Sequence, residues 1–248
     1  MRSTNAVKNA VKLGGAVALT LAMAVNFTQG GPDNAGNPGV APPQSSAYGK
    51  TYSQWAATWW QWVVTIPASE NPLFDESGAN VTTGQSGPLW FLCGVWNESG
   101  SATRTATIPA GKALFFPILN YVWVSTPDEP PWNEPYTDPG SGITYETFMA
   151  YQEVHIKAVV DAMTDLACEV DGVALQNLTA YREASPVFSV TLPEDNIFGV
   201  DPGTYGPGLD GGYYLLLTPL PKGEHILHFH GTSGSFTLDV TYNLTVLK

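Results

Sequence analysis

Two histidines near the carboxyl end of the chain have the spacing of a pair of metal ligands. His228 and His230 are separated by one residue in an apolar run that is typical of a β-strand. Residues two apart share a face of a strand, so both imidazoles can converge on one ion, and imidazole suits Zn, Cu, Fe or Ni. A third ligand would have to come from elsewhere, with Asp239 or a loop acid as candidates. One hypothesis is therefore a metal site, and the alternative is two ordinary surface histidines.

A loop in which carboxylates alternate with aromatic rings is the second candidate site. Residues 125–142 are dense in proline and acid. The side chains of interest in this loop are Asp128, Glu129, Trp132, Glu134, Tyr136 and Asp138. Aromatic rings stack on the apolar faces of sugars and acids hold sugar hydroxyls, so the loop predicts a ligand site for a glycan. Two carboxylates at a suitable separation would instead support a glycosidase or lyase, and a solvated, proline-stiffened loop is the plain alternative.

Other catalytic signatures are missing from the sequence. No G-x-S-x-G nucleophile elbow is present, and no glycine-rich phosphate loop leads from a strand into a helix. The formal net charge of −12 disfavours nucleic acid and anionic lipid as partners, and it favours cations or neutral ligands. No motif requires a cofactor, and a transition metal ion is the one candidate.

The amino-terminal segment predicts export. Its basic residues are Arg2, Lys8 and Lys12. An apolar run over residues 13–25 follows, and the small residues around Met23 fit a signal-peptidase site, which predicts a signal peptide over residues 1–24. The run is shorter than the roughly 20 residues that cross a bilayer, although an N-terminal membrane anchor is the alternative. Loss of its three basic residues would lower the formal net charge from −12 to −15. We therefore expect a secreted protein, extracellular or periplasmic.

Export bears on the interpretation of the two cysteines and of five glycosylation sequons. Cys93 and Cys168 are the only cysteines, and an isolated pair in an oxidising compartment is most simply one disulfide. A metal pair or a reactive thiol is the alternative. The N-x-S/T sequons lie at Asn26, Asn80, Asn97, Asn177 and Asn243. They predict a glycoprotein only in a host that performs this modification.

The remaining sequence predicts one domain behind a leader. Residues 25–48 are rich in Gly, Pro, Asn and Ser, which predicts a flexible leader, with an ordered strap as the alternative. Residues 49–248 then form a single domain. Within it we expect helices near residues 52–64 and 144–163. The first begins at a Thr51-x-x-Gln54 capping box and carries a tryptophan stripe that must face a large apolar surface.

Most other segments have strand patterns. They are residues 88–95, 103–108, 112–119, 167–175, 186–192, 213–217, 223–230 and 236–246. Asp171-Gly172 predicts a hairpin turn, Pro117 marks an edge strand or a bulge, and residues 193–212 predict a second long loop. The expected fold is mainly β, an antiparallel β-sandwich or jelly-roll-like domain with two packed helices. A closed, cupin-like β-barrel is the alternative.

Several motifs together resemble a group of exported microbial proteins of uncharacterised activity. They are Trp55…Trp59-Trp60-x-Trp62, Gly87-Pro-Leu-Trp-Phe-Leu92, Pro109-Ala-Gly-Lys-Ala-Leu-Phe-Phe-Pro-Ile-Leu-Asn120, Tyr181-Arg182…Ser185-Pro186 and Gly223-Glu-His225. The resemblance spans most of residues 50–248. It implies a Trp-rich N-terminal helix on a β-sandwich core and brings no activity with it.

The function that these observations favour is an exported β-sandwich that binds a glycan or another neutral or cationic ligand, or that acts in cell-surface interaction. One alternative is a metal-dependent extracellular enzyme that uses His228 and His230. Another is a glycosidase or lyase that uses the loop carboxylates. A third is a self-associating surface-fibre subunit whose leader donates a strand to a neighbour. Whether the protein is an enzyme stays open at this point.

Overall fold

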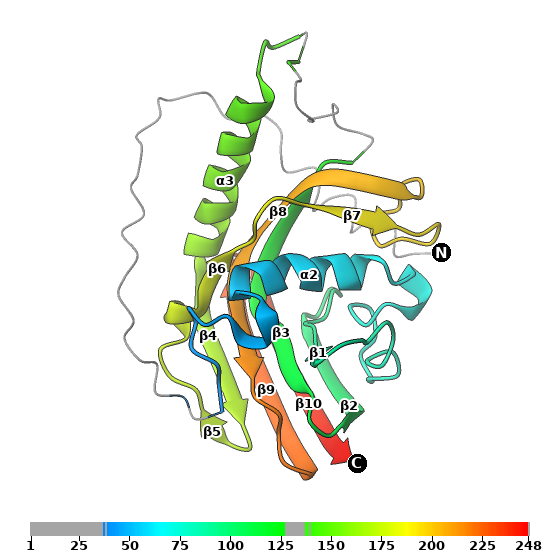
Figure 1. Cartoon of the computed structure of the whole chain (residues 1–248), viewed down its shortest axis with the longest axis vertical. Helices are drawn as coiled ribbons and strands as arrows, with labels where there is room; N and C mark the ends of the chain where they lie inside the picture. The colour runs from blue at the N-terminus through cyan, green and yellow to red at the C-terminus, as the bar shows by residue number, and fades with distance from the viewer. Residues whose placement is uncertain (1–36, 38, 127–136, 139, 248) are drawn as a thin grey trace.

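The computed structural model describes residues 37, 39–126, 137–138 and 140–247 (Figure 1). The predicted signal peptide, Asn26 and the leader up to residue 36 lie outside the described residues. In the described part the chain forms two five-stranded sheets and two α-helices, α2 (Tyr52–Val64) and α3 (Tyr145–Asp161). No helix in this part is long and apolar enough to cross a membrane. The expectation of a mainly β fold with two helices is confirmed.

The two sheets, which we call A and B, are both mixed. Sheet A contains β1 (Leu89–Phe91), β3 (Ala113–Val124), β8 (Gly203–Leu217) and β6 (Arg182–Ala184) in that order, with β7 (Phe188–Leu192) also paired to β8. Sheet B contains β2 (Ser101–Pro109), β10 (Phe236–Leu247), β9 (Gly223–Ser233), β4 (Met163–Val170) and β5 (Val173–Ala174) in that order. The β1–β3 and β2–β10 pairs are parallel and the others antiparallel. Because β2 lies in sheet B while β1 and β3 lie in sheet A, no hairpin joins β1 to β2 or β2 to β3.

Helix α2 and sheet B cover opposite faces of sheet A. On one face, the Tyr52 ring of α2 lies 6.0 Å from the ring of Phe115. On the other face, the Phe116 ring lies 5.0 Å from the ring of Phe229 in β9. Helix α3 packs against β3 and β8 beyond the end of sheet B (Figure 1). Neither sheet closes into a barrel, so the sandwich is the correct alternative.

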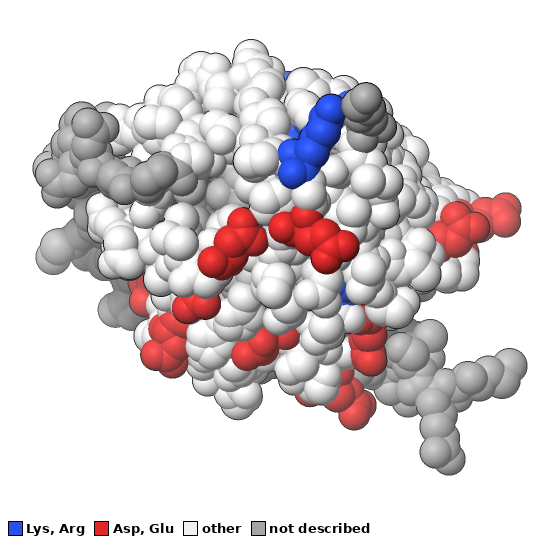
Figure 2. Space-filling model, turned by 90° about the horizontal axis from the view of Figure 1, so that it is seen from below, with Lys and Arg blue, Asp and Glu red and all other residues white. Residues whose placement is uncertain are grey.

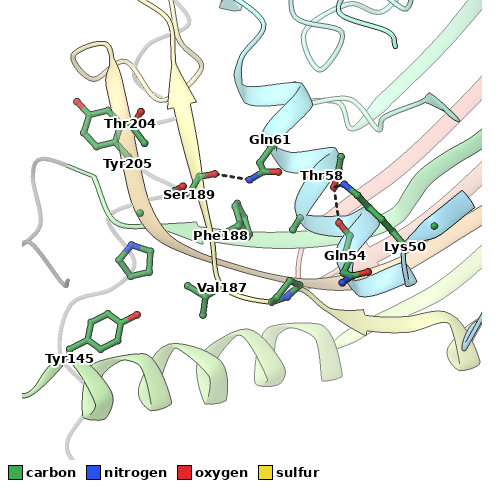
Figure 3. A pocket seen from close by; sticks show the side chains of 15 residues that line it. Lys50, Gln54, Thr58, Gln61, Tyr145, Val187, Phe188, Ser189, Thr204 and Tyr205 are labelled. Carbon is green, nitrogen blue, oxygen red and sulfur yellow. Dashed lines mark hydrogen bonds between the residues drawn. The ribbon is translucent and has the colours of Figure 1, made fainter. Parts of the chain in front are cut away.

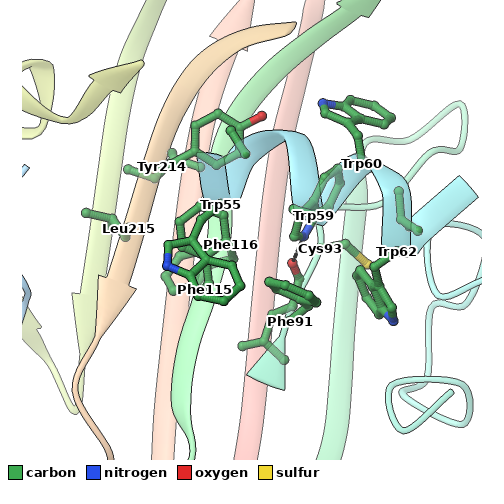
Figure 4. Close-up of a cluster of buried hydrophobic side chains, with 14 of the residues drawn as sticks. Trp55, Trp59, Trp60, Trp62, Phe91, Cys93, Phe115, Phe116, Tyr214 and Leu215 are labelled. Carbon is green, nitrogen blue, oxygen red and sulfur yellow. Dashed lines mark hydrogen bonds between the residues drawn. The ribbon is translucent and has the colours of Figure 1, made fainter. Parts of the chain in front are cut away.

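Local signals place both helices where the sequence predicts them. The Thr51 side chain accepts a hydrogen bond from the N–H of Gln54, and the Gln54 side chain accepts one from the N–H of Thr51. This capping box begins α2. Thr144 caps α3 by accepting from the N–H of Thr147. Figure 4 shows the tryptophans of α2 among the rings of Phe91 and Phe115, which they contact in the core.

The described part of the predicted leader is an ordered strap. The N–H of Ala41 donates to the carbonyl of Leu216 at 2.9 Å, and Gly39 accepts from the N–H of Thr218 at 2.8 Å. The Tyr52 hydroxyl then donates to the Ala41 carbonyl at 2.7 Å. Residues 39–41 therefore pair with the carboxyl end of β8, past the point at which β6 pairs with it.

One strand prediction needs correction. Residues 203–212 belong to β8 and not to a loop. Their glycines lie where neighbouring elements approach the strand closely. A Cβ on Gly212 would lie 2.5 Å from the Asn120 Cβ, and a Cβ on Gly211 would lie 2.8 Å from Ile156 of α3. Pro117 does coincide with a bulge, but it lies in β3, which has a neighbour on each side and is no edge strand.

The predicted disulfide between Cys93 and Cys168 is wrong. Both cysteines are free and buried. Cys93 lies against Arg104 and Tyr242, at the β2–β10 pair, whereas Cys168 lies in β4. Strand β9 lies between β4, which holds Cys168, and β10, which Cys93 contacts through the side chain of Tyr242. The sequence alone contains no information on this lateral separation.

We expect two free thiols that react only after unfolding. Burial raises the pKa of both Cys93 and Cys168, so little thiolate is present at neutral pH and reagents have no access. A chromogenic thiol reagent should therefore titrate two groups in urea and almost none in the native protein. A protein that yields no thiols in urea without reductant would contain the disulfide and contradict the structure.

A fully buried arginine joins sheet B to the segment around β1. Arg104 of β2 is 0% exposed, and its Nε donates to the carbonyl of Asp75 at 2.7 Å. The two terminal nitrogens donate to four further oxygens at 2.5–3.0 Å: the carbonyls of Pro72, Cys93 and Gly94 and the hydroxyl of Tyr242. All five guanidinium hydrogens thus have acceptors, which offsets the cost of burying the charge.

Replacement of Arg104 should destabilise the fold strongly. Lysine has three donors in place of five, so an Arg104→Lys variant leaves buried carbonyls unsatisfied and should lose on the order of 3 kcal/mol of unfolding free energy. Urea denaturation measures this loss. Arg182→Lys is the matched control, because Arg182 pairs with the half-exposed Asp161 and should lose less than about 1 kcal/mol. Equal losses in the two variants would contradict this role of Arg104.

Candidate functional site

A groove of about 1080 Å³ lies between α2 and the β7–β8 hairpin (Figure 3). Helix α2 forms one wall, β7 and the first residues of β8 form the other, and Tyr145 at the start of α3 lies at one end. The main side chains lining it are Lys50, Gln54, Thr58, Gln61, Tyr145, Val187, Phe188, Ser189, Thr204, Tyr205 and Pro207. Among the described residues that line the groove none is acidic, and Lys50 is the one charged group.

The wall made by α2 is the polar side of an otherwise aromatic helix. Gln54, Thr58 and Gln61 are spaced at intervals of four and three residues, so they share one face away from the buried tryptophans. Hydrogen bonds join this side of α2 to the edge strands of sheet A. The Ser53 hydroxyl donates to the carbonyl of Ala184 in β6 at 2.6 Å, and Gln61 Nε2 donates to the carbonyl of Ser189 in β7 at 3.0 Å.

The groove offers both donors and acceptors to a ligand. Gln61 is held through its Nε2, and Gln54 is held through its Oε1 by the N–H of Thr51. The other amide atoms, Gln61 Oε1 and Gln54 Nε2, have no hydrogen-bond partner within the described part of the chain. Lys50 Nζ donates to Thr58 at 2.7 Å and lies 4.8 Å above the Trp55 ring, so its charge is already engaged. The arrangement is suited to uncharged hydroxyl groups.

A buried carboxyl group behind the groove fixes the position of α2. Asp210 of β8 is 1% exposed and accepts from Trp60 Nε1 at 2.6 Å and from the Tyr214 hydroxyl at 2.7 Å. Burial disfavours the ionised form and raises the pKa of Asp210 to about 7, although both hydrogen bonds oppose this shift. Because Trp60 belongs to α2, this contact helps to set the distance between the two walls.

Most residues of the predicted acidic loop lie outside the described residues: Asp128, Glu129, Trp132, Glu134 and Tyr136. Asp138 is described, and it accepts hydrogen bonds from the N–H and hydroxyl of Ser141, which lower its pKa. Its role is therefore to close a turn before α3. The described residues on either side of the loop reach the groove, because the N–H of Ser125 donates to Pro207 at 3.0 Å and Tyr145 lines one end.

The histidine pair lies elsewhere, on the outer face of sheet B. His228 Nε2 is 3.1 Å from Asp239 Oδ1, and His230 Nδ1 is 4.0 Å from Asp239 Oδ2. As the sequence predicts, the two histidines share one face of the strand, and Asp239 lies next to them. In the described part of the chain, no group of three or more such side chains is arranged as a ready metal site. His225 points away and binds Asp171 instead, at 2.7 Å.

Sequence reasoning missed the groove. The polar stripe Gln54, Thr58 and Gln61 was visible beside the tryptophan stripe, but its partner wall depends on how β7 and β8 pack against α2. No protein-family profile, curated protein sequence or solved structure matches the chain. The geometry and chemistry of the described residues therefore carry the functional conclusion.

The buried acids should make the protein less stable as the pH rises from about 4 to about 7. Burial raises the pKa of both Asp210 and Glu183 to about 7, whereas carboxyl groups in the unfolded chain titrate near 4. Between these values the folded state binds more protons, so the unfolding free energy falls with pH and then levels off. Urea denaturation across this range measures the slope.

The Asp210→Asn variant should show a clearly shallower slope, because asparagine keeps the contacts to Trp60 and Tyr214 without the ionisation. A remaining slope is expected from Glu183. Asp201→Asn, at an exposed acid before β8, is the control and should keep the wild-type slope. If Asp210→Asn keeps it as well, Asp210 is not the buried titrating group.

Proposed function

We propose that this protein binds a neutral glycan in the groove between α2 and the β7–β8 hairpin. The observation that carries the proposal is the lining: amides and hydroxyls lie next to the rings of Tyr145, Phe188 and Tyr205, and none of the described lining residues carries a carboxylate. Sugars present adjacent hydroxyls that both donate and accept, and their C–H faces pack on aromatic rings. The volume suits a short oligosaccharide.

Binding, rather than glycoside cleavage, is the activity that this groove supports. A glycosidase of the common type needs two carboxyl groups that flank the scissile bond. The lining side chains in the described part of the chain include none. A binding function draws on the chain's own side chains and calls for no cofactor.

The charge of the protein favours an uncharged glycan. The formal net charge is −12, and Figure 2 shows acidic side chains spread over a mostly uncharged surface with few basic ones. Such a field repels polyanionic polymers. The predicted signal peptide is consistent with a glycan ligand met in the periplasm or outside the cell.

Tyr205 is the best residue with which to test the proposal. A Tyr205→Ala variant removes a ring from the β8 wall and should weaken binding at least tenfold, about 1.4 kcal/mol. The measurement is isothermal titration calorimetry with the best neutral oligosaccharide found on a glycan array. Tyr151→Ala, which removes an exposed ring from α3 away from the groove, is the matched control and should bind like the wild type.

Two results would overturn the proposal. One is the absence of any neutral glycan among the array hits for the folded wild-type protein. The other is a glycan whose affinity is equal in the wild type and in Tyr205→Ala, because that ligand would bind elsewhere.

A further inference from the structure

We propose that His228, His230 and Asp239 bind a divalent transition-metal ion, with Zn²⁺ as the representative, on the outer face of sheet B. The site is on the opposite side of sheet A from α2 and the groove. It is therefore independent of the proposed glycan binding.

Strand register brings the three side chains together. In the β9–β10 pair, Asp239 lies directly opposite His230, and His228 lies one diagonal step away on the same face. The Asp239 carboxylate reaches both imidazoles, with N···O distances of 3.1 Å and 4.0 Å. Ligands of a tetrahedral Zn²⁺ ion at bond lengths of about 2.0–2.2 Å lie about 3.3–3.6 Å from one another. The His228 distance is slightly shorter than this range and the His230 distance slightly longer, and the two involve different oxygens of Asp239.

Only a small rearrangement separates this cluster from a metal site. Asp239 now accepts a hydrogen bond from His228, and the three groups do not share one centre in the described part of the chain. The side chains of His228 and His230 are 33% and 27% exposed, so both rings have room to rotate. A metal ion would replace the hydrogen bond with two direct bonds and draw the His230 ring closer to the carboxylate.

The surroundings favour a cation and leave room for further ligands. Glu169 of β4 is in register with His228 on the far side of β9. On the other side, a depression of about 310 Å³ opens beside Asp239, lined also by Glu76, Ser101 and Thr103. None of the outward-facing residues of β2, β9 and β10 is a lysine or an arginine. Two imidazoles and one carboxylate form a donor set that suits a divalent transition-metal ion.

Titration of the metal-free full-length protein with ZnCl₂ tests the proposal. Calorimetry should show one site with a dissociation constant near micromolar, and bound Co²⁺ should give the visible absorption of a tetrahedral centre. His230→Ala and Asp239→Asn should each weaken Zn²⁺ binding at least tenfold. His225→Ala is the matched control, because His225 lies on the same strand and contacts an aspartate without a second imidazole.

Each outcome of the titration either supports or contradicts the proposal. Thermal unfolding of each variant shows whether it is folded. The proposal fails if the wild type binds no Zn²⁺, if Asp239→Asn binds like the wild type, or if His225→Ala weakens binding as much as His230→Ala. The titration contains no glycan, so its result does not depend on the groove.

Discussion

The buried guanidinium of Arg104 is the interaction on which the arrangement of the sandwich depends. Its acceptors include the carbonyls of Cys93 and Gly94, which follow β1 in the chain. The carbonyl of the preceding residue, Leu92, accepts from Trp59 Nε1 of α2 at 2.8 Å. One short segment thus connects the charge buried in sheet B to the helix on the far face of sheet A. Because this charge has carbonyl and hydroxyl acceptors, its stabilisation depends on backbone geometry, which no single side chain can replace.

Several contacts hold helix α2 in position beside the groove. Its aromatic face is buried, Trp60 is bonded to Asp210, and Ser53 and Gln61 are bonded to the edges of β6 and β7. The groove is therefore preformed, so a ligand does not have to order this wall as it binds. The hydrogen bonds of Ser53 and Gln61 also satisfy carbonyls of the edge strands, which would otherwise be open to pairing with another chain.

The sequence was sufficient where the signal is local. The capping box at Thr51, the turn at Asp171-Gly172 and the alternation of β10, with Tyr242 buried and Asn243 exposed, all identify their elements correctly. The failures concern contacts between distant segments: the disulfide, the parallel strand pairs and the glycines of β8. The candidate sites show the same difference between local signals and contacts of distant segments. Period-two spacing placed His228 and His230 on one face, but only strand register brings Asp239 to them, and only the packing of α2 creates the groove.

The distribution of acids reconciles a strongly acidic protein with an uncharged groove. Burial raises the pKa of Asp210 and Glu183, so these two carboxyls are partly neutral near pH 7, and the exposed carboxylates carry the negative charge. On the outer face of sheet B, Asp239 and its neighbours lie on strands without outward lysine or arginine, where the field of the protein concentrates cations. Around the groove, the described lining residues include no acid and present amides, hydroxyls and rings. The two faces are thus chemically distinct in the described part of the chain.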